Sequence, residues 1–491
     1  MPRAMSLLPL FAAAAFAESA VERKPLAIGT KIETGKIVEG ESNQYVGENP
    51  DDFFLSYIGV NLTQEVVVDR RMELKVGVGG VFFYSFPNRR GNSAAQGTKF
   101  GPGVSQAQAL FKLGGVENPW GSFRLGYFPY KYNPDARNLG EYLFRSMPYP
   151  ALVTTGGWSI TDNALVRAQG LAFTVSQWEG RLKHEFILMS ERDFRPQGDF
   201  SPAYLFQADA GPFQFGGGVS LHHFLPIDSK LSKTDPANAG KDLVLRYKAF
   251  PAFAAAQNQY LARDEDTVRH GQGAPLTATL TDMDGVILEN PQLTMDPKSY
   301  RVTDAAGNVY IPDTIRYTTQ GVKLMARASF DVQKIVPLAF LGPEDLKLYG
   351  EVALLGWKNQ PGYYEKRWDR APRMIGFNLP AFRLLDLLSL EVEYFPNPMD
   401  DDMEQMISKG NYIPLPFGSG LLFPSVNHED DWKWSVYASK QVLSGFSLRA
   451  QIANDHFRAP QITPNQHLFA SVPATRKAGN WYYVVTLNFG I

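Results

Sequence analysis

Cysteine is absent from the 491-residue chain. This absence excludes a thiol nucleophile, a thiolate metal site, an iron–sulfur cluster, a disulfide framework and a lipid anchor on cysteine. An excess of either charge is absent too, because 48 Lys and Arg face 50 Asp and Glu. Nucleic-acid-binding domains carry a basic excess, so we expect no nucleic-acid partner. The 43 Gly and 34 Pro do not indicate a collagen or a disordered chain, because aromatic residues reach 13%.

Catalytic signatures are absent as well. The sequence contains no HExxH, no GxSxG, no P-loop and no dinucleotide-binding glycine fingerprint. His222 and His223 are adjacent, and adjacent residues of a strand point to opposite faces, so they make a poor metal pair. We therefore predict no enzymatic activity, no catalytic residues, no metal site and no cofactor.

Long apolar runs are absent beyond the N-terminus. Residues 1–17 combine a basic start at Arg3, a short apolar stretch and the small-x-small ending Ala15-Phe16-Ala17, which is the pattern of a secretory signal peptide. The alternative, an N-terminal membrane anchor, needs roughly 20 apolar residues. We predict a mature chain of residues 18–491 with no transmembrane helix. A chain without such a helix can cross a membrane only as a closed barrel.

What the sequence does contain is apolar alternation with a period of two. In the last segment one phase is apolar and largely aromatic: Trp481, Tyr483, Val485, Leu487, Phe489 and Ile491. Such alternation predicts strands with one apolar and one polar face. We place about sixteen strands, near residues 26–37, 53–62, 72–85, 103–113, 120–129, 164–176, 181–190, 201–208, 212–224, 315–332, 345–357, 373–380, 384–396, 431–441, 445–454 and 480–491.

The connections between these strands alternate in length. Odd connections such as 38–52 and 86–102 are long, and even ones such as 114–119 and 209–211 are short. A soluble secreted sandwich gives no reason for this regularity. A barrel with both termini in the periplasm does, because its periplasmic turns are short and its extracellular loops are long.

With its signal peptide, alternating strands, alternating loop lengths and terminal strand, the chain resembles the Gram-negative outer-membrane porin superfamily. Most members end in Phe or Trp, where this chain ends in Ile491. The resemblance implies an all-β fold, a transmembrane antiparallel up-and-down β-barrel with about 14 to 18 strands.

The long connection 130–163 is the first candidate for function. Asn133-Pro134-Asp135 predicts a helix start, and Arg137, Glu141 and Arg145 follow at every fourth residue, on one helical stripe. In porins the third extracellular loop folds into the lumen and narrows it. We therefore expect these three residues to constrict a pore. The alternative is a solvated, salt-bridged face on a surface loop.

The polar phase of the strands is the second candidate, because it carries charges of both signs. On lipid, an Arg or Lys near the bilayer midplane costs roughly 2–4 kcal/mol, whereas in a water-filled lumen it costs little. The charged phase is therefore predicted to face inward. The predicted pore-lining residues are Lys75, Arg124, Arg167, Lys183, Glu185, Lys323, Arg327, Lys347, Glu351, Glu391, Glu393 and Arg449.

The longest connection, 225–314, is predicted to hold structure of its own, because unstructured loops of this length are uncommon. Residues 300–302 and 309–311, joined by a polar stretch, predict a hairpin. Residues 244–262 predict a partly helical segment. We expect the whole insertion to be extracellular, as a cap, a lid or a binding surface.

The resemblance implies a function for the whole chain. It implies passive diffusion of small hydrophilic solutes or ions across the outer membrane of a Gram-negative bacterium. The implied partners are outer-membrane lipid and lipopolysaccharide, the barrel-assembly machinery and further copies in a homotrimer. The alternative is a closed barrel whose long loops serve as a surface scaffold or adhesin.

Overall fold

In the computed structural model the chain is described over residues 21–40, 54–84, 99–144, 166–190, 199–222, 224–225, 243–250, 260–262, 279–281, 287–288, 294–295, 302–303, 309–317, 321–357, 366–396, 431–454, 460–462, 468–470 and 479–490. The predicted signal peptide and Arg145 lie outside these ranges. Within them, no helix has the length and apolar character needed to cross a membrane.

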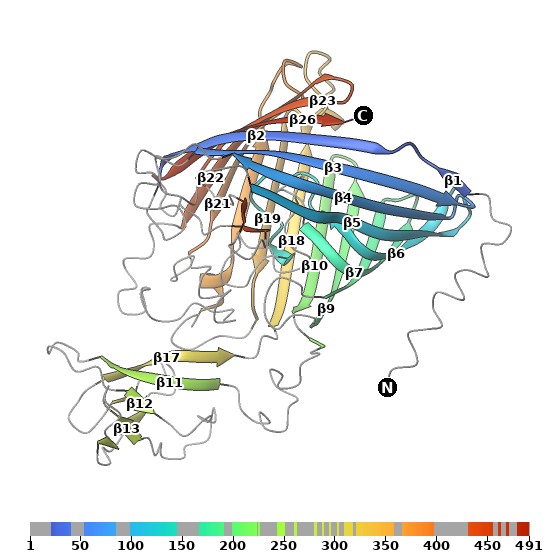
Figure 1. Cartoon of the computed structure of the whole chain (residues 1–491). Coiled ribbons are helices and arrows are strands. Elements are labelled where there is room, and N and C mark those ends of the chain that lie inside the picture. The colour runs from blue at the N-terminus through green and yellow to red at the C-terminus, as the bar shows by residue number, and fades with distance from the viewer. Residues whose placement is uncertain are drawn as a thin grey trace.

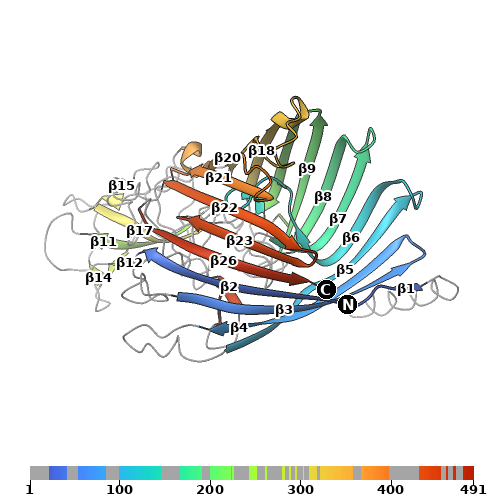
Figure 2. The ribbon, with the colours of Figure 1, turned by 90° about the horizontal axis from the view of Figure 1, so that it is seen from above.

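Sixteen strands form one closed antiparallel barrel (Figures 1 and 2). Each strand pairs with the next along the chain, and the last pairs with the first, with Val485 opposite Thr34. All sixteen predicted strands are confirmed. Their bounds are β2 (Ala27–Glu39), β3 (Phe54–Val68), β4 (Met72–Tyr84), β5 (Lys99–Gly114), β6 (Pro119–Tyr130), β7 (Val166–Gln177), β8 (Leu182–Ser190), β9 (Phe200–Ala210), β10 (Phe213–His222), β18 (Gly321–Asp331), β19 (Lys347–Leu354), β20 (Arg373–Asn378), β21 (Leu387–Tyr394), β22 (Trp432–Leu443), β23 (Phe446–Ala453) and β26 (Trp481–Gly490).

The two faces of the wall differ in chemistry. On β22, Trp432 points outward with 54% of its surface exposed, while Lys433 points inward and is 1% exposed. On β21, Glu391 and Glu393 are buried on the inner face, and Leu390 is exposed on the outer face. Because side chains alternate along a strand, the apolar phase covers the outside of the barrel and the polar phase lines its inside.

Short connections gather at one end of the barrel. Residues 69–71, 115–118, 178–181, 211–212, 332–346, 379–386 and 444–445 join consecutive strands there. The strand β1 (Val21–Arg23) pairs with the last residues of β3 at the same end. The wall is uneven, because β3 to β6 have 12 to 16 residues whereas β19, β20 and β21 have 8, 6 and 8.

The insertion between β10 and β18 forms a sheet of its own, away from β1 (Figure 1). The predicted hairpin is confirmed, since Val302 pairs with Tyr310. The partly helical segment predicted over 244–262 is not found over its described residues, 244–250 and 260–262. Its described residues form strands, because the alternating residues that follow Leu243 pair with the strand that ends at Tyr317. The strands are β11 (Leu243–Phe250), β12 (Tyr260–Ala262), β13 (Thr279–Thr281), β14 (Ile287–Leu288), β15 (Thr294–Met295), β16 (Val302–Thr303) and β17 (Val309–Tyr317); β24 (Pro460–Ile462) and β25 (Leu468–Ala470) form a separate pair.

Candidate functional site: a segment anchored inside the barrel

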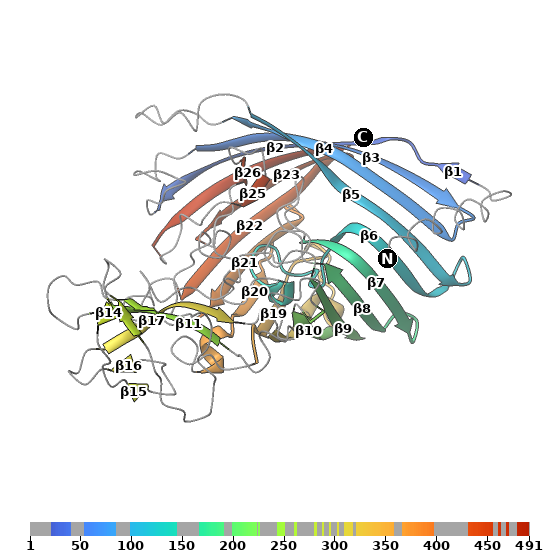
Figure 3. The same ribbon diagram turned by 60° about the horizontal axis from the view of Figure 1, so that its bottom comes forward.

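Residues 131–144, which follow β6 and are called the inner segment below, lie inside the barrel (Figure 3). The 3-10 turn η3 (Tyr142–Phe144) at its end contacts β10, β18 and β19 of the wall. The predicted helix that was to start at Asp135 is wrong, because η3 is the only helical turn between residues 131 and 144. Gly140 and Glu141 have φ angles of +86° and +58°, which no α-helix accommodates.

Glu351 on β19 holds one part of the inner segment. Its carboxylate accepts hydrogen bonds from the Tyr132 hydroxyl at 2.6 Å and the Asn133 side-chain amide at 2.7 Å. It also accepts the backbone N–H groups of Glu141 at 3.1 Å and Tyr142 at 2.9 Å. Burial and the adjacent carboxylate raise the pKa of the Tyr132 phenol well above its usual range, because both favour the neutral phenol that donates this hydrogen bond.

Glu391 on β21 holds the tip of the inner segment. It accepts the backbone N–H of Arg137 at 2.6 Å and those of Asn138 and Leu139 at 2.9 Å each. The Tyr349 hydroxyl adds a fourth hydrogen bond at 2.9 Å. Charge-assisted hydrogen bonds are stronger than neutral ones. The two carboxylates therefore accept hydrogen bonds from backbone N–H groups that, in a helix, would donate to carbonyls of the helix itself.

Apolar packing fixes the other side of the inner segment. Leu139, Leu143 and Phe144 are at most 5% exposed and belong to one buried cluster with wall residues such as Phe128 and Met325. The Phe144 ring meets the Tyr130 and Tyr132 rings edge to face, at centroid distances of 5.4 and 5.7 Å. The inner segment is thus packed onto the wall from β6 to β19 as a protein core is packed.

The predicted constriction residues are not equivalent in the structure. Arg137 faces a cavity, pairs with Glu344 at 3.4 Å and donates to the carbonyl of Pro134 at 3.0 Å. Glu141 is 4% exposed and turns back into the inner segment, where it accepts the N–H of Asn133 at 2.7 Å. A shared helical stripe of Arg137 and Glu141 is therefore wrong. Arg145 lies outside the described residues.

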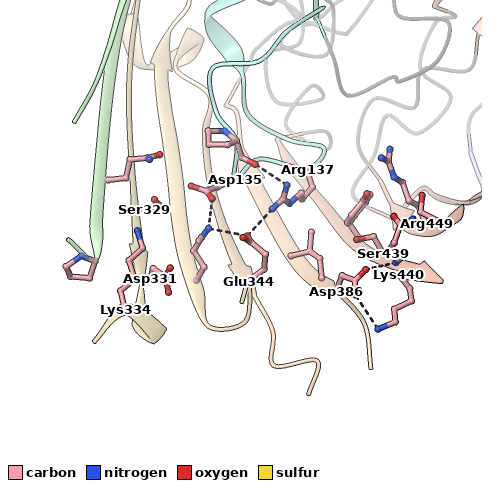
Figure 4. Close-up of a pocket in the computed structure, with 18 residues that line it drawn as sticks. Asp135, Arg137, Ser329, Asp331, Lys334, Glu344, Asp386, Ser439, Lys440 and Arg449 are labelled. Atoms are coloured by element: carbon pink, nitrogen blue, oxygen red, sulfur yellow. Dashed lines mark hydrogen bonds and ion pairs between the residues drawn. The ribbon is translucent and has the colours of Figure 1, made fainter. Parts of the chain in front are cut away.

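The cavity lies between the tip of the inner segment and the short-connection end of the wall, and has a volume of about 540 Å³ (Figure 4). A chain of ion pairs crosses it. Asp135 contacts Lys347 at 3.1 Å, Lys347 contacts Glu344 at 3.1 Å, and Glu344 contacts Arg137. On the opposite flank Arg449 points into the space. The cavity is polar and carries both signs of charge.

All but one of the remaining predicted pore-lining residues lie on inner faces of the strands, in several environments. Lys75 pairs with Glu65 at 2.8 Å, and Lys183 pairs with Glu185 at 3.2 Å. The Arg124 guanidinium lies 5.2 Å from the centre of the Phe128 ring. The predicted inward position of Arg167 is wrong: its neighbour Ala168 pairs with Phe128 on the buried inner face, so Arg167, opposite Pro129, lies on the outer phase of β7. Its side chain is outside the described part of the structure.

Three further predicted positions are deeply buried. Lys323 is 0% exposed on β18, and Arg327 donates to the side-chain oxygens of Gln207 and Gln214 at 2.8 Å each. Glu393 accepts the Tyr142 hydroxyl at 2.6 Å. Sequence analysis missed Glu344 and Tyr132 and took Asp135 only as part of a helix start, because their partners are set by how the inner segment folds onto distant strands.

Solved structures similar to this chain are bacterial porins, at low sequence identity. Salmonella typhi OmpF in complex with daunomycin is 9% identical, with a TM-score of 0.40 and coverage of 96% of this chain and 98% of that chain. An anion-selective porin from Comamonas acidovorans is 12% identical, with a TM-score of 0.38 and coverage of 96% and 100%. A triple mutant of the Rh. blastica porin is 8% identical, with a TM-score of 0.37 and the same coverage. No family model and no curated protein matches the chain.

The strand pairing itself defines the architecture. Every barrel strand is hydrogen-bonded to two antiparallel neighbours, and the pairing of β26 with β2 closes the ring. This chain therefore folds as a porin-like closed barrel of sixteen antiparallel strands.

Proposed function

We propose that this protein is an outer-membrane channel through which small hydrophilic solutes or ions diffuse passively. The observation that supports this most is the inner segment, which Glu351 and Glu391 anchor inside a barrel with an apolar outer face and a charged inner face. An apolar outer face suits lipid, and a polar inner face suits water.

In this proposal solutes pass between the inner segment and the opposite wall, and then through the polar cavity. Arg137 and Lys347 flank that path from the inner segment and β19, and Arg449 flanks it from β23. Charges on both sides orient and select solutes through their electric field, an effect that salt screens. The predicted pore-lining residues tune this field.

The proposal places the protein in the outer membrane of a Gram-negative bacterium after removal of residues 1–17. The short connections then face the periplasm, and the insertion sheet of β11 to β17 faces outward. Lipopolysaccharide, the barrel-assembly machinery and a homotrimer are the partners that this location would supply.

A closed surface scaffold is the second candidate, and the separate insertion sheet favours it. Single-channel recording of the refolded chain in planar bilayers distinguishes the two functions. The channel predicts stepwise conductance that scales with salt concentration. A barrel that is folded on a heat-modifiability gel and gives no steps contradicts the channel and supports the scaffold.

A further inference from the structure

Three neighbouring connections at the short-connection end expose large apolar side chains. They are residues 332–346, residues 379–386, and the turn 444–445 taken with the last two residues of β22, and they adjoin β18 to β23. The side chains are 48 to 77% exposed, and none of them lines the polar cavity. We call this set the apolar rim: Ile335, Val336, Phe340, Phe382, Leu384, Val442 and Leu443.

The apolar rim is held in a defined arrangement. The rings of Phe340 and Phe382 stack with centroids 6.2 Å apart and planes 16° from parallel. Arg383 donates its Nε–H to the carbonyl of Leu341 at 3.1 Å, and this bond ties the two longer connections together. Lys440 contacts Asp386 at 3.2 Å and so links the second connection to β22, the strand that carries Val442 and Leu443. These contacts therefore hold the apolar side chains of the rim in exposed positions.

On the opposite side of the same end the turns between β3 and β6 are polar, although Val21 and Trp120 beside them are 55% and 51% exposed. The connection between β3 and β4 is Asp69-Arg70-Arg71, and the one between β5 and β6 includes Glu117 and Asn118. Those turns join strands of 12 to 16 residues. The apolar turns instead join β18 to β19, β20 to β21 and β22 to β23, which have 11, 8, 6, 8, 12 and 8 residues.

This correlation has a physical reason if the barrel crosses a bilayer. A transmembrane strand needs about 9 to 11 residues when tilted. Four of the six strands have 6 to 8 residues, below this length, so the apolar turns beyond them extend the surface that hydrocarbon can cover. The outer faces of the same strands are apolar, with Leu348, Ile375 and Leu390 exposed. The apolar rim continues that surface toward the short-connection end.

We propose that the apolar rim lies within the membrane and is covered by the acyl chains of the leaflet that faces the short connections. The exposed side chain of Arg383 adjoins the rim, and long basic side chains at this depth extend to phosphate headgroups. The side of the barrel formed by β18 to β23 would then lie deeper in the membrane than the side formed by β3 to β6. This inference rests on the proposed membrane location.

The absence of cysteine gives a direct test. Single-cysteine variants Leu384→Cys and Phe340→Cys each carry one thiol, and Glu117→Cys is the matched control in a polar turn at the same end. Each thiol receives an environment-sensitive fluorophore, and the full chain is refolded into vesicles of phosphatidylethanolamine and phosphatidylglycerol. Quenching is then compared between nitroxide-labelled lipid and aqueous iodide.

The proposal predicts that the lipid nitroxide quenches the labels at 384 and 340 several-fold more than iodide does, with the reverse order at 117. Equal iodide quenching at 384 and 117 would place the rim in water and overturn the proposal. Shielding from both quenchers, with cross-linking of the thiols between copies, would assign the rim to a protein interface and also overturn it. Conductance of the same vesicles separates a failure of this proposal from a failure of the proposed channel function. A barrel that conducts while its apolar rim is exposed to water contradicts the membrane position of the rim and leaves the channel function intact.

Discussion

Glu391, in the middle of β21, accepts the backbone N–H of Leu139 at 2.9 Å across 252 positions of sequence. The other carboxylate oxygen accepts the N–H of Arg137 and the Tyr349 hydroxyl. Both oxygens are therefore fully used as acceptors. This side chain joins the far wall of the barrel to the tip of the inner segment, and it sets the geometry of the proposed constriction.

Substituting Glu391→Gln should release that tip. A glutamine amide replaces one acceptor by a donor, so backbone N–H groups face an N–H₂ group and lose their partner. An unsatisfied buried donor lowers the free energy of unfolding by about 1–3 kcal/mol, and unfolding of the variant and the parent in detergent measures this difference. The inner segment should also become mobile and make single-channel conductance larger or noisier. Glu65→Gln is the control, because Glu65 pairs with Lys75 at an inner-face position that is partly exposed. If both variants conduct like the parent, the anchoring role is wrong.

Two glycines with the same backbone conformation test the inner segment by packing. Gly140 and Gly180 have φ angles of +86° and +85°. An alanine held at such a positive φ destabilises the folded state by about 1–2 kcal/mol at either position. At Gly140 the added Cβ also meets Met374 at 3.1 Å and Glu351 at 3.3 Å, whereas at Gly180 it meets open space. Gly140→Ala should therefore change conductance and Gly180→Ala should not. Equal conductance changes in both variants would contradict a constriction at residues 131–144.

Arg137 is the one described member of the predicted constriction set that faces the cavity. Its replacement by Ala removes a cation and leaves Glu344 with Lys347 as its partner. The reversal potential in a salt gradient should shift toward cation preference, most strongly at low ionic strength, where screening is weak. Arg181→Ala makes the same change in net charge in an exposed turn. A shift of equal size in that variant would show that Arg137 has no special place in the path.

The outer face gives a prediction about lipid. Ile375 on β20 is 56% exposed on the outside of the wall, and Arg at such a position costs roughly 2–4 kcal/mol near the bilayer midplane. Ile375→Arg should reduce the yield of folding into vesicles. Ser439→Arg adds the same charge to the polar cavity and should fold like the parent. A barrel that folds equally well with both substitutions, in the absence of lipid, would be a soluble β-protein.

The barrel could be predicted from sequence because its signal is local. Alternation such as Trp432, Trp434 and Val436 against Lys433 and Ser435 depends on neighbouring residues alone, and it marks both the strand and its inner face. The lengths of the connections then limited the topology. The distribution of charge between the faces followed from the same pattern.

The inner segment could not be predicted in detail, because its partners are remote. The spacing of Arg137, Glu141 and Arg145 fits a helix only if each amide bonds within the segment. Glu351 and Glu391 instead accept those amides from strands more than 200 positions away. No local pattern distinguishes a pore-lining glutamate from one that holds a backbone.

Asp386 links the connection before β21 to β22 and gives a dependence of stability on pH. The backbone N–H of Gln441, and then the Lys440 ammonium, lower the pKa of this carboxyl below its usual value. A depressed folded-state pKa stabilises the folded protein at every pH above the unfolded value of about 3.9. This contribution disappears as pH falls through the lower folded-state pKa.

Asp386→Asn should therefore be less stable than the parent at neutral pH, and the difference should vanish in acid. Unfolding of both chains in detergent across this range measures it, and a difference that is constant with pH would show that the carboxylate charge is not the source.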